Sequence, residues 1–300
     1  MVSFRRGVGS AEDYFMAGRS FGTLVLFMSL FGTNVTAFAL VGMPGISYHA
    51  GIGAVRYLWR SCCFCYPAVL YFNGYPIWVL GKRHGYMTQP HMFSDRWQSP
   101  AVGYLLFAVL IFYTIPYLII GLMGGGITIE AISGGVVPYA LAAGIVAVVT
   151  LLYTSLGGMR GTAWTNVFQA SIFLLFLGVA CWGIATKLGG FQVLNERLVN
   201  EAPHLLGKQH PRLAPGIWAT GFLIGPFSVI AFPHIFMRLM TAGSAKALKR
   251  TIFLYPPALV LLYIPITLIG VWGALDMPGL IGKESVRFYL CWWKCICQSG

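Results

Sequence analysis

Residues that weaken helical backbone interrupt an apolar segment near the beginning of the chain. The segment covers residues 21–48, and its interrupting residues are Gly32, Thr33, Asn34, Val35 and Thr36. Glycine lowers helix propensity, valine and threonine are β-branched, and threonine or asparagine side chains can bond to nearby backbone. Inside a bilayer, irregular backbone persists only where protein buries it or a cavity adjoins it. The pattern predicts either a broken helix that holds a small ligand or ion, or polar side chains that bond to a neighbouring helix.

A second apolar segment, residues 216–240, is also interrupted. The residues that interrupt it include Gly225, Pro226, Ser228, Pro233 and His234. Two interrupted segments, five segments apart, indicate paired broken helices in a transporter built from repeats. His234 could bind a substrate or titrate near neutral pH, or it could support a helix kink by hydrogen bonding.

Glu130 is the only acidic residue inside a predicted membrane span. A carboxylate within a membrane is a functional hypothesis by default, because its burial is costly. Glu130 is expected near the outer end of residues 101–133, where an interfacial position explains it equally well.

Six of the seven cysteines fall in residues 62–65 and 291–297. Thiolates at short spacing can bind zinc or copper. No histidine or second paired-cysteine motif accompanies them at zinc-finger spacing, so the alternative is a poorly constrained stretch. Arg56 and Arg60 lie beside the first cluster, and arginine at the centre of a span costs at least ~2.5 kcal/mol. Either both arginines lie near a membrane interface, or this segment inserts poorly into the membrane.

The composition is that of a polytopic membrane protein. Hydrophobic residues make up 57% of the chain, charged residues 9%, and the mean hydropathy is +0.74. Seven segments reach the length of about 20 residues that a membrane helix needs. They cover approximately residues 21–48, 54–80, 101–133, 136–156, 164–187, 216–240 and 252–275.

The basic residues indicate membrane topology and no nucleic-acid partner. The formal charge of +12 comes from short clusters between apolar segments, without one continuous basic face. With the amino terminus in the cytoplasm, most of these clusters fall in inward loops. Gly157 and Gly158, followed by Arg160, predict a tight cytoplasmic turn with a basic anchor. A short amphipathic helix is expected on the outer surface within residues 188–206.

The predicted spans do not contain the residues of an enzyme active site. No serine, cysteine or pair of carboxylates inside them combines into a nucleophile or acid–base arrangement. No catalytic residue and no enzyme activity are therefore expected.

Three sequence motifs together resemble the sodium/solute symporter family. Residues 13–22 and 29–51 are similar to that family's first core helix and its broken centre. Residues 151–176 are similar to its signature across the fourth and fifth core helices, and residues 232–251 to its sixth helix with a basic turn. The resemblance covers about residues 11–275.

This resemblance implies an all-α fold of the leucine-transporter type, with a five-plus-five inverted repeat and sodium-driven uptake of a small solute by alternating access. Na⁺ is the implied coupling ion, and no other cofactor is implied. Carried over by position, the carbonyls of Gly32 and Val35 would bind sodium, while hydroxyls on an eighth helix would complete the site. Residues expected to line the substrate or cation site are Thr33, Asn34, Thr36, Gly225, Ser228, Phe232 and His234.

Three departures from the family pattern limit this expectation. The chain ends after about seven spans, so the eighth helix with its hydroxyl ligands is expected to be absent. Asn166 occupies the place of an aspartate that could serve a second cation or a gating pair, a role for which Glu130 is the other candidate. Ala39 replaces the polar residue found in sugar-transporting members, which argues against a sugar substrate.

The predicted organisation has three parts. Residues 1–20 form a cytoplasmic segment, residues 21–275 form the transporter domain in the plasma (inner) membrane, and residues 276–300 form a tail. The first repeat covers about 21–187, and the second begins at about 216–275. The alternative is a seven-helix receptor or channel-like protein without coupled transport, which a cytoplasmic amino terminus disfavours.

Overall fold

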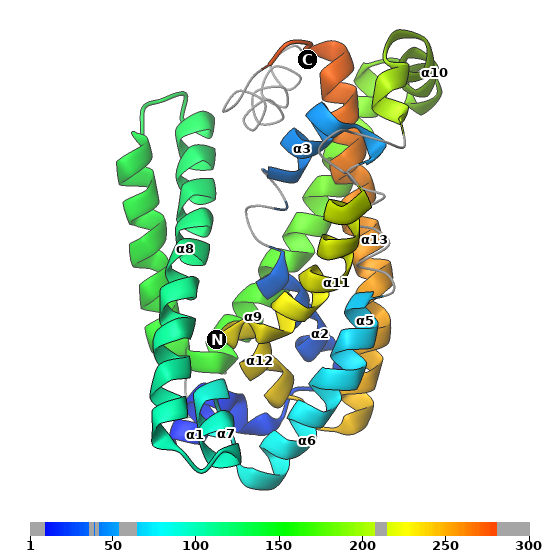
Figure 1. The fold of residues 1–300 in the computed structure, drawn as a ribbon. Coiled ribbons are helices and arrows are strands. Elements are labelled where there is room, and N and C mark those ends of the chain that lie inside the picture. The colour runs from blue at the N-terminus through cyan, green and yellow to red at the C-terminus, as the bar shows by residue number, and fades with distance from the viewer. Residues whose placement is uncertain (1–9, 36–38, 40–41, 54–64, 208–214, 281–300) are drawn as a thin grey trace.

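The computed structural model describes residues 10–35, 39, 42–53, 65–207 and 215–280. All elements in these ranges are helical, apart from one isolated bridge between Phe21 and Ala242 (Figure 1). They are α1 (Ala11–Met16), η2 (Ala17–Arg19), α2 (Thr23–Asn34), α3 (Met43–Ala50), α5 (Tyr66–Val69), η5 (Leu70–Gly74), α6 (Tyr75–His84), α7 (Gln89–Arg96), α8 (Pro100–Ile132), α9 (Tyr139–Lys187), α10 (Phe191–Glu201), η6 (Pro203–Leu206), α11 (Pro215–Ala231), α12 (Pro233–Met240) and α13 (Ala245–Asp276).

Three of the described helices, α8, α9 and α13, are long and apolar enough to cross a membrane. Residues 222–231 and α12 pass the same test together, although the chain bends by 66° between them. The expected interruption of the sixth segment is therefore present as a sharp bend. These helices make the chain a multi-pass membrane protein, as its composition predicts.

Helix α9 joins two of the predicted spans. It covers 49 residues, more than twice the length that a bilayer needs, and contains a non-helical residue, Gly158, with φ 51° and ψ −151°. Residues 139–157 form a first arm beside α8, and residues 159–187 form a second arm that crosses the middle of the molecule in another direction (Figure 1). The positive φ explains why glycine occupies this turn.

Helix α1 packs on the Gly158 turn. The Tyr14 hydroxyl donates to the Ser155 carbonyl at 2.9 Å, and Arg160 forms an ion pair with Asp13 at 2.6 Å. A Cβ atom on Gly158 would lie 2.8 Å from the Tyr14 carbonyl oxygen. These contacts fix the turn against the beginning of the chain.

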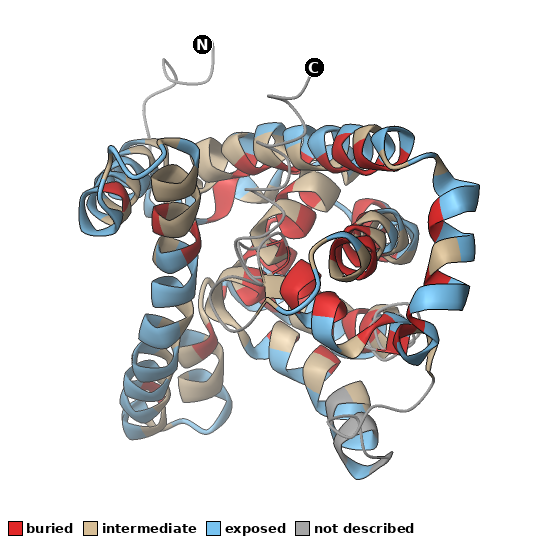
Figure 2. Ribbon diagram, turned by 90° about the horizontal axis from the view of Figure 1, so that it is seen from above, coloured by how far each residue is buried: buried red, intermediate tan, exposed pale blue. Residues whose placement is uncertain are grey.

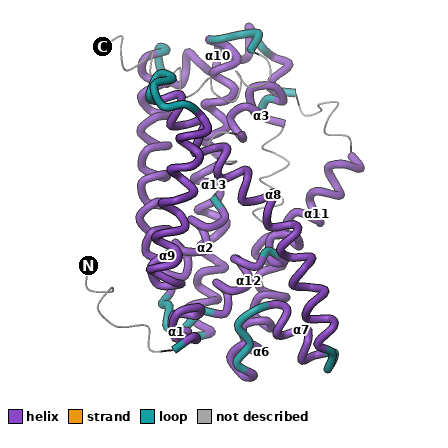
Figure 3. The backbone as a smooth tube through the Cα atoms, turned by 90° about the vertical axis from the view of Figure 1, so that its left-hand side faces the viewer, coloured by secondary structure: helices purple, strands orange, loops and turns teal. Residues whose placement is uncertain are grey.

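The core lies between α2, α13 and the second arm of α9. Phe31 of α2 and Tyr255 and Trp272 of α13 are fully buried there. In the view along the bundle, buried residues gather on the central helices, whereas the outlying ones are mainly exposed (Figure 2). Helices α1, α6 and α7 lie at one end of the molecule, and α3 and α10 at the other (Figure 3).

The amphipathic helix expected within residues 188–206 is confirmed as α10. Leu194 and Leu198 are buried on one side, and Leu198 packs in a cluster with Val271 of α13. Arg197 and Glu201 form an exposed ion pair at 3.0 Å. The alternation of apolar and charged residues along α10 produces these two faces.

Candidate functional site

The first interrupted segment forms two helices separated by a break. Helix α2 continues through Asn34, and Val35 ends it with φ −78° and ψ 89°. Helix α3 begins at Met43. The break begins at Val35, inside the predicted stretch, while Gly32, Thr33 and Asn34 remain helical. Thr36 lies outside the described residues.

Close packing compensates for the low helix propensity of Gly32. A Cβ atom at this position would lie 2.7 Å from the carbonyl oxygen of Asn166 on the second arm of α9. Real Cβ atoms do not approach backbone oxygen so closely, so any larger residue would push the two helices apart. Glycine therefore permits contact between α2 and α9 here.

Asn166 ties α2 to the second arm of α9. Its side chain is 9% exposed, and its Nδ2 atom donates to the Ser29 carbonyl at 3.3 Å and to the Thr33 hydroxyl at 2.5 Å. The family resemblance implied a missing charge at this position. In the structure, the amide acts as a donor between two helices, close to the break at Val35.

Arg238 of α12 reaches the same turn of α2. Its side chain is 7% exposed and donates a hydrogen bond to the Ser29 hydroxyl. The ion pairs found among the described residues do not include Arg238. Ser29 thus connects Asn166 and Arg238, and we call Ser29, Thr33, Asn166 and Arg238 the central polar cluster.

Two members of the central polar cluster, Ser29 and Arg238, were not predicted from the sequence. A basic residue within an interrupted apolar segment is a signal that could have identified Arg238, because such residues are rare in membranes and have partners there. The position of Ser29 offered no comparable signal.

Gln89 stabilises the bend between α11 and α12. The Ala231 carbonyl precedes Phe232 and Pro233 at the bend, and the Gln89 Nε2 atom donates to it at 2.7 Å. Gln89 is 7% exposed and belongs to α7. Its bond satisfies a backbone oxygen at the break, as a buried irregular backbone requires.

His234 packs among aromatic rings at the bend. Its ring centroid lies 5.0 Å from that of Tyr117 on α8 and 5.2 Å from that of Phe232. The Tyr117 and Phe232 rings are also 5.0 Å apart. The structure therefore places Phe232 and His234 together, against α8.

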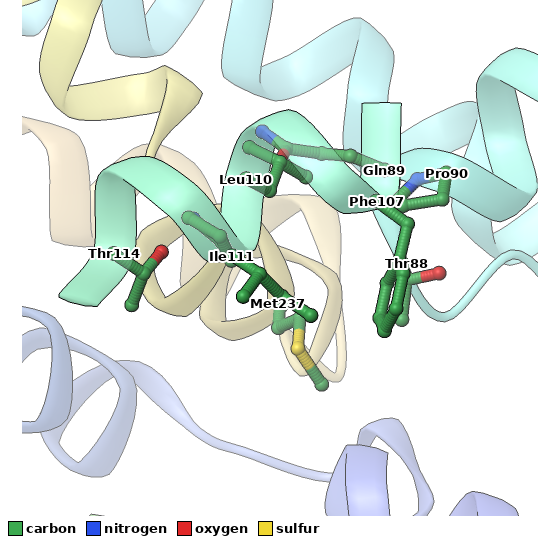
Figure 4. Close-up of a pocket in the computed structure, with 9 residues that line it drawn as sticks. Thr88, Gln89, Pro90, Phe107, Leu110, Ile111, Thr114 and Met237 are labelled. Atoms are coloured by element: carbon green, nitrogen blue, oxygen red, sulfur yellow. The ribbon is translucent and has the colours of Figure 1, made fainter. Parts of the chain in front are cut away.

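A cavity of about 350 Å³ lies between α7, α8 and α12 beside this bend (Figure 4). Its lining is mainly apolar, with Phe107 and Ile111 from α8 and Met237 from α12. Gln89 and Pro233 connect it to the bend. None of the residues predicted to line the substrate site contributes to its wall.

The remaining predicted site residues lie elsewhere. The Ser228 hydroxyl is exposed and donates to the Gly225 carbonyl of its own helix at 2.7 Å. Glu130 is half-buried in the last turn of α8, and its carbonyl accepts a bond from Gly135 at 2.9 Å. Glu130 thus lies near the end of α8, while its outer location and its role stay predictions.

The residues that the structure describes contain no group of three or more His, Cys, Asp or Glu side chains suited to a metal ion. Cys65 and Cys181 are free thiols. The other members of the two cysteine-rich stretches, together with Arg56 and Arg60, lie outside the described residues.

Comparison with known proteins gives one family model, described as the sodium:solute symporter family, which matches residues 14–286. The chain is 28% identical to the uncharacterized symporter YhjB of Bacillus subtilis, over 91% of the chain and 56% of the relative. It is 27% identical to the sodium/pantothenate symporter of Escherichia coli, over 92% of the chain and 57% of the relative. It is 25% identical to the sodium/proline symporter of Escherichia coli, over 93% of the chain and 56% of the relative. The chain thus spans a little more than half the length of these relatives.

Proposed function

Because this chain belongs to the sodium:solute symporter family, we propose that it serves sodium-coupled uptake of a small organic solute by alternating access. Relatives named as sodium/pantothenate and sodium/proline symporters support this function. Ala39 supports a solute other than a sugar. The observation that carries the proposal is the break at Val35, held between the second arm of α9 and α12 by the central polar cluster.

The break supplies oxygen atoms for sodium. A helix that ends at Val35 leaves nearby carbonyls without helical partners, and hard cations prefer oxygen ligands. We assign the carbonyls of Gly32 and Val35 to sodium, with Thr33, Asn34 and Thr36 beside them. Further ligands come from a later helix of the inverted-repeat fold.

The central polar cluster supplies a mechanism for coupling. Ser29 binds both Asn166 of α9 and Arg238 of α12, so it joins a helix of the first repeat to the sixth core helix. It lies about 9 Å along α2 from Val35, since an α-helix rises 1.5 Å per residue. Sodium at the break favours the conformation that keeps this cluster intact, and solute binding then permits the repeats to rock.

The charge distribution supports a cytoplasmic amino terminus in a plasma membrane. Arg19, Lys82, Arg83 and Arg96 lie at the end of the molecule that holds α1, α6 and α7. At the opposite end, Arg197 is neutralised by Glu201. Positive residues accumulate on the cytoplasmic side of membrane proteins.

Uptake by the full-length gene product in proteoliposomes tests the proposal, with radiolabelled proline and pantothenate as probes. We expect an inward sodium gradient to drive accumulation of at least one probe, while a potassium gradient does not. Sodium should also raise the thermal unfolding midpoint relative to potassium, because a bound ion stabilises the folded state. Absence of both sodium effects would overturn the proposal.

Two substitutions test whether the dependence of uptake on sodium arises at the break. Asn34→Ala and Gly32→Leu should abolish sodium-dependent uptake, while the protein still inserts into the membrane. Gly178→Leu is the matched control, because a Cβ atom on Gly178 meets no atom within 4 Å. Normal sodium dependence in both site variants would refute the assignment to the break.

A further inference from the structure

Cations gather where α6 and α13 meet, away from the break. Helix α6 ends with Lys82, Arg83 and His84, and α13 begins with Lys246, Lys249 and Arg250 close behind Ser244. The two helices lie side by side at the end of the molecule that holds α1 and α7 (Figure 1). We call Lys82, Lys246, Lys249 and Arg250 with their neighbouring aromatic residues the α6–α13 basic surface.

Hydrogen bonds fix the two parts of this surface to each other. The Trp78 indole donates to the Ala242 carbonyl at 2.8 Å, and the Lys82 ammonium lies 3.5 Å from the Gly243 carbonyl. Both acceptors belong to the short connection that precedes α13. The positions of the cations on α6 and α13 are therefore coupled.

The cations of this surface have no carboxylate partner among the described residues. The ion pairs found there involve Arg19, Arg160 and Arg197. Lys246, Lys249 and Arg250 also lie near the beginning of α13, where the helix dipole disfavours positive charge. Their mutual repulsion and the dipole both favour an anion from outside the protein.

Aromatic rings lie directly beside these cations. The Lys249 ammonium is 5.1 Å from the ring centroid of Tyr75 and 5.9 Å from that of Tyr71. The Lys82 ammonium is 5.3 Å from the Trp78 ring. Tyrosine and tryptophan next to lysine are typical of the membrane interface, where their rings can contact both lipid headgroups and hydrocarbon.

Exposed apolar residues continue the surface away from the cations. Phe253 follows Lys249 by one helical turn and is 77% exposed, and Tyr71 is 40% exposed. A free inorganic anion would leave this apolar part uncovered. A molecule with an anionic head and hydrocarbon chains covers both parts.

We propose that the α6–α13 basic surface binds an anionic phospholipid, with its phosphate at Lys246, Lys249 and Arg250 and its acyl chains over Tyr71 and Phe253. The position at the basic end of the bundle places the headgroup in the leaflet that carries negative lipid. Lipid there reduces repulsion among the cations and fastens α13 to α6. Binding of the lipid requires only membrane insertion and is independent of sodium coupling.

Native mass spectrometry of the purified chain in mixed micelles tests the site, with equal amounts of phosphatidylglycerol and phosphatidylcholine. We expect preferential retention of phosphatidylglycerol. K246Q/K249Q/R250Q should reduce this retention more than tenfold, since each cation near a charged membrane surface contributes about fivefold. The matched control K187Q/R197Q, at the opposite end, should retain phosphatidylglycerol normally.

Two single variants and a competitor distinguish a bound lipid from a free anion. K249R should retain the lipid, because it keeps the charge, and Y71A should weaken retention while leaving all cations in place. Millimolar glycerol phosphate, which lacks acyl chains, should not displace the bound lipid. Equal retention of both lipids by the wild type, an unchanged triple variant, or displacement by glycerol phosphate would each overturn the proposal.

Discussion

The two arms of α9 are both apolar, but the second arm buries more of its residues than the first. In the first arm, Val148, Leu151 and Leu152 are 57%, 66% and 57% exposed. In the second arm, Ala163 and Ala170 are completely buried. Hydropathy alone would give both arms the same environment. An apolar membrane helix can therefore face either lipid or protein, and its hydropathy does not distinguish the two.

Mostly small residues form the buried face of the second arm. The buried residues of the second arm recur at helical spacing and are mostly small or polar: Ala163, Asn166, Ala170, Ala180, Cys181 and Ala185. Small residues let helix backbones approach closely, since lipid supplies no hydrophobic force between helices. The first arm has one completely buried residue, Ala142, among those that the structure describes.

The first arm nevertheless packs closely against α8 along one narrow face. A Cβ atom on Gly126 would lie 2.8 Å from the Tyr139 ring, and one on Gly125 would lie 3.0 Å from Val146. The large side chains on the remaining faces, such as Leu151, are exposed. The hairpin of α8 and the first arm is thus packed along one line only.

Substitution of alanine by leucine is expected to give the largest difference between the arms in the free energy of unfolding. Ala170→Leu adds volume to a completely buried position, and overpacking of this kind costs about 1–3 kcal/mol. Ala140→Leu, at an exposed position of the first arm, should change the free energy of unfolding by less than about 0.5 kcal/mol. Thermal unfolding in detergent measures both. Equal loss of stability in the two variants would show that the first arm is packed as tightly as the second.

Substitution in the turn between the arms is expected to destabilise the protein by a similar amount. Gly158→Ala forces a side chain onto a residue with φ +51° and brings its Cβ atom to 2.8 Å from the Tyr14 carbonyl. A strained backbone of this kind costs about 1–3 kcal/mol. Gly157→Ala is the matched control, because its nearest neighbour is 4.0 Å away. If both variants unfolded at the wild-type midpoint, the arms would not depend on this turn.

Helix α10, which follows the second arm, has an exposed ion pair. Removing this pair is expected to change the stability of the protein least. Arg197 lowers the pKa of Glu201, chiefly by its hydrogen bond. A lowered folded-state pKa stabilises the protein above the unfolded value of about 4.5, and this contribution disappears as the pH falls through the folded value.

Glu201→Gln should therefore lower the unfolding midpoint slightly at pH 7. The difference from wild type should shrink as the pH falls below the unfolded value of about 4.5, and it should vanish below the folded-state value. The effect is small because the pair is exposed to water. A difference that grows on acidification would contradict the assigned direction of the pKa shift.

Patterns along the sequence predicted much of the fold. Apolar length predicted α8, both arms of α9 and α13, and amphipathic spacing predicted α10. Gly158 was expected in a tight turn and lies in one. The family resemblance was also correct. The predicted break includes Val35, where α2 ends. Helix propensity did not show that Gly32 stays helical, because it ignores the packing of Gly32 on α9.

By itself, the sequence determined a helical membrane protein, its family and the existence of two interrupted helices. Length, hydropathy and backbone propensity are properties of neighbouring residues, so they can be read locally. Only the tertiary structure decided which residues hold the interruptions in place. Asn166 binds a residue 137 positions away, and Arg238 binds one 209 positions away. No local pattern specifies such pairs, because they depend on how the helices pack.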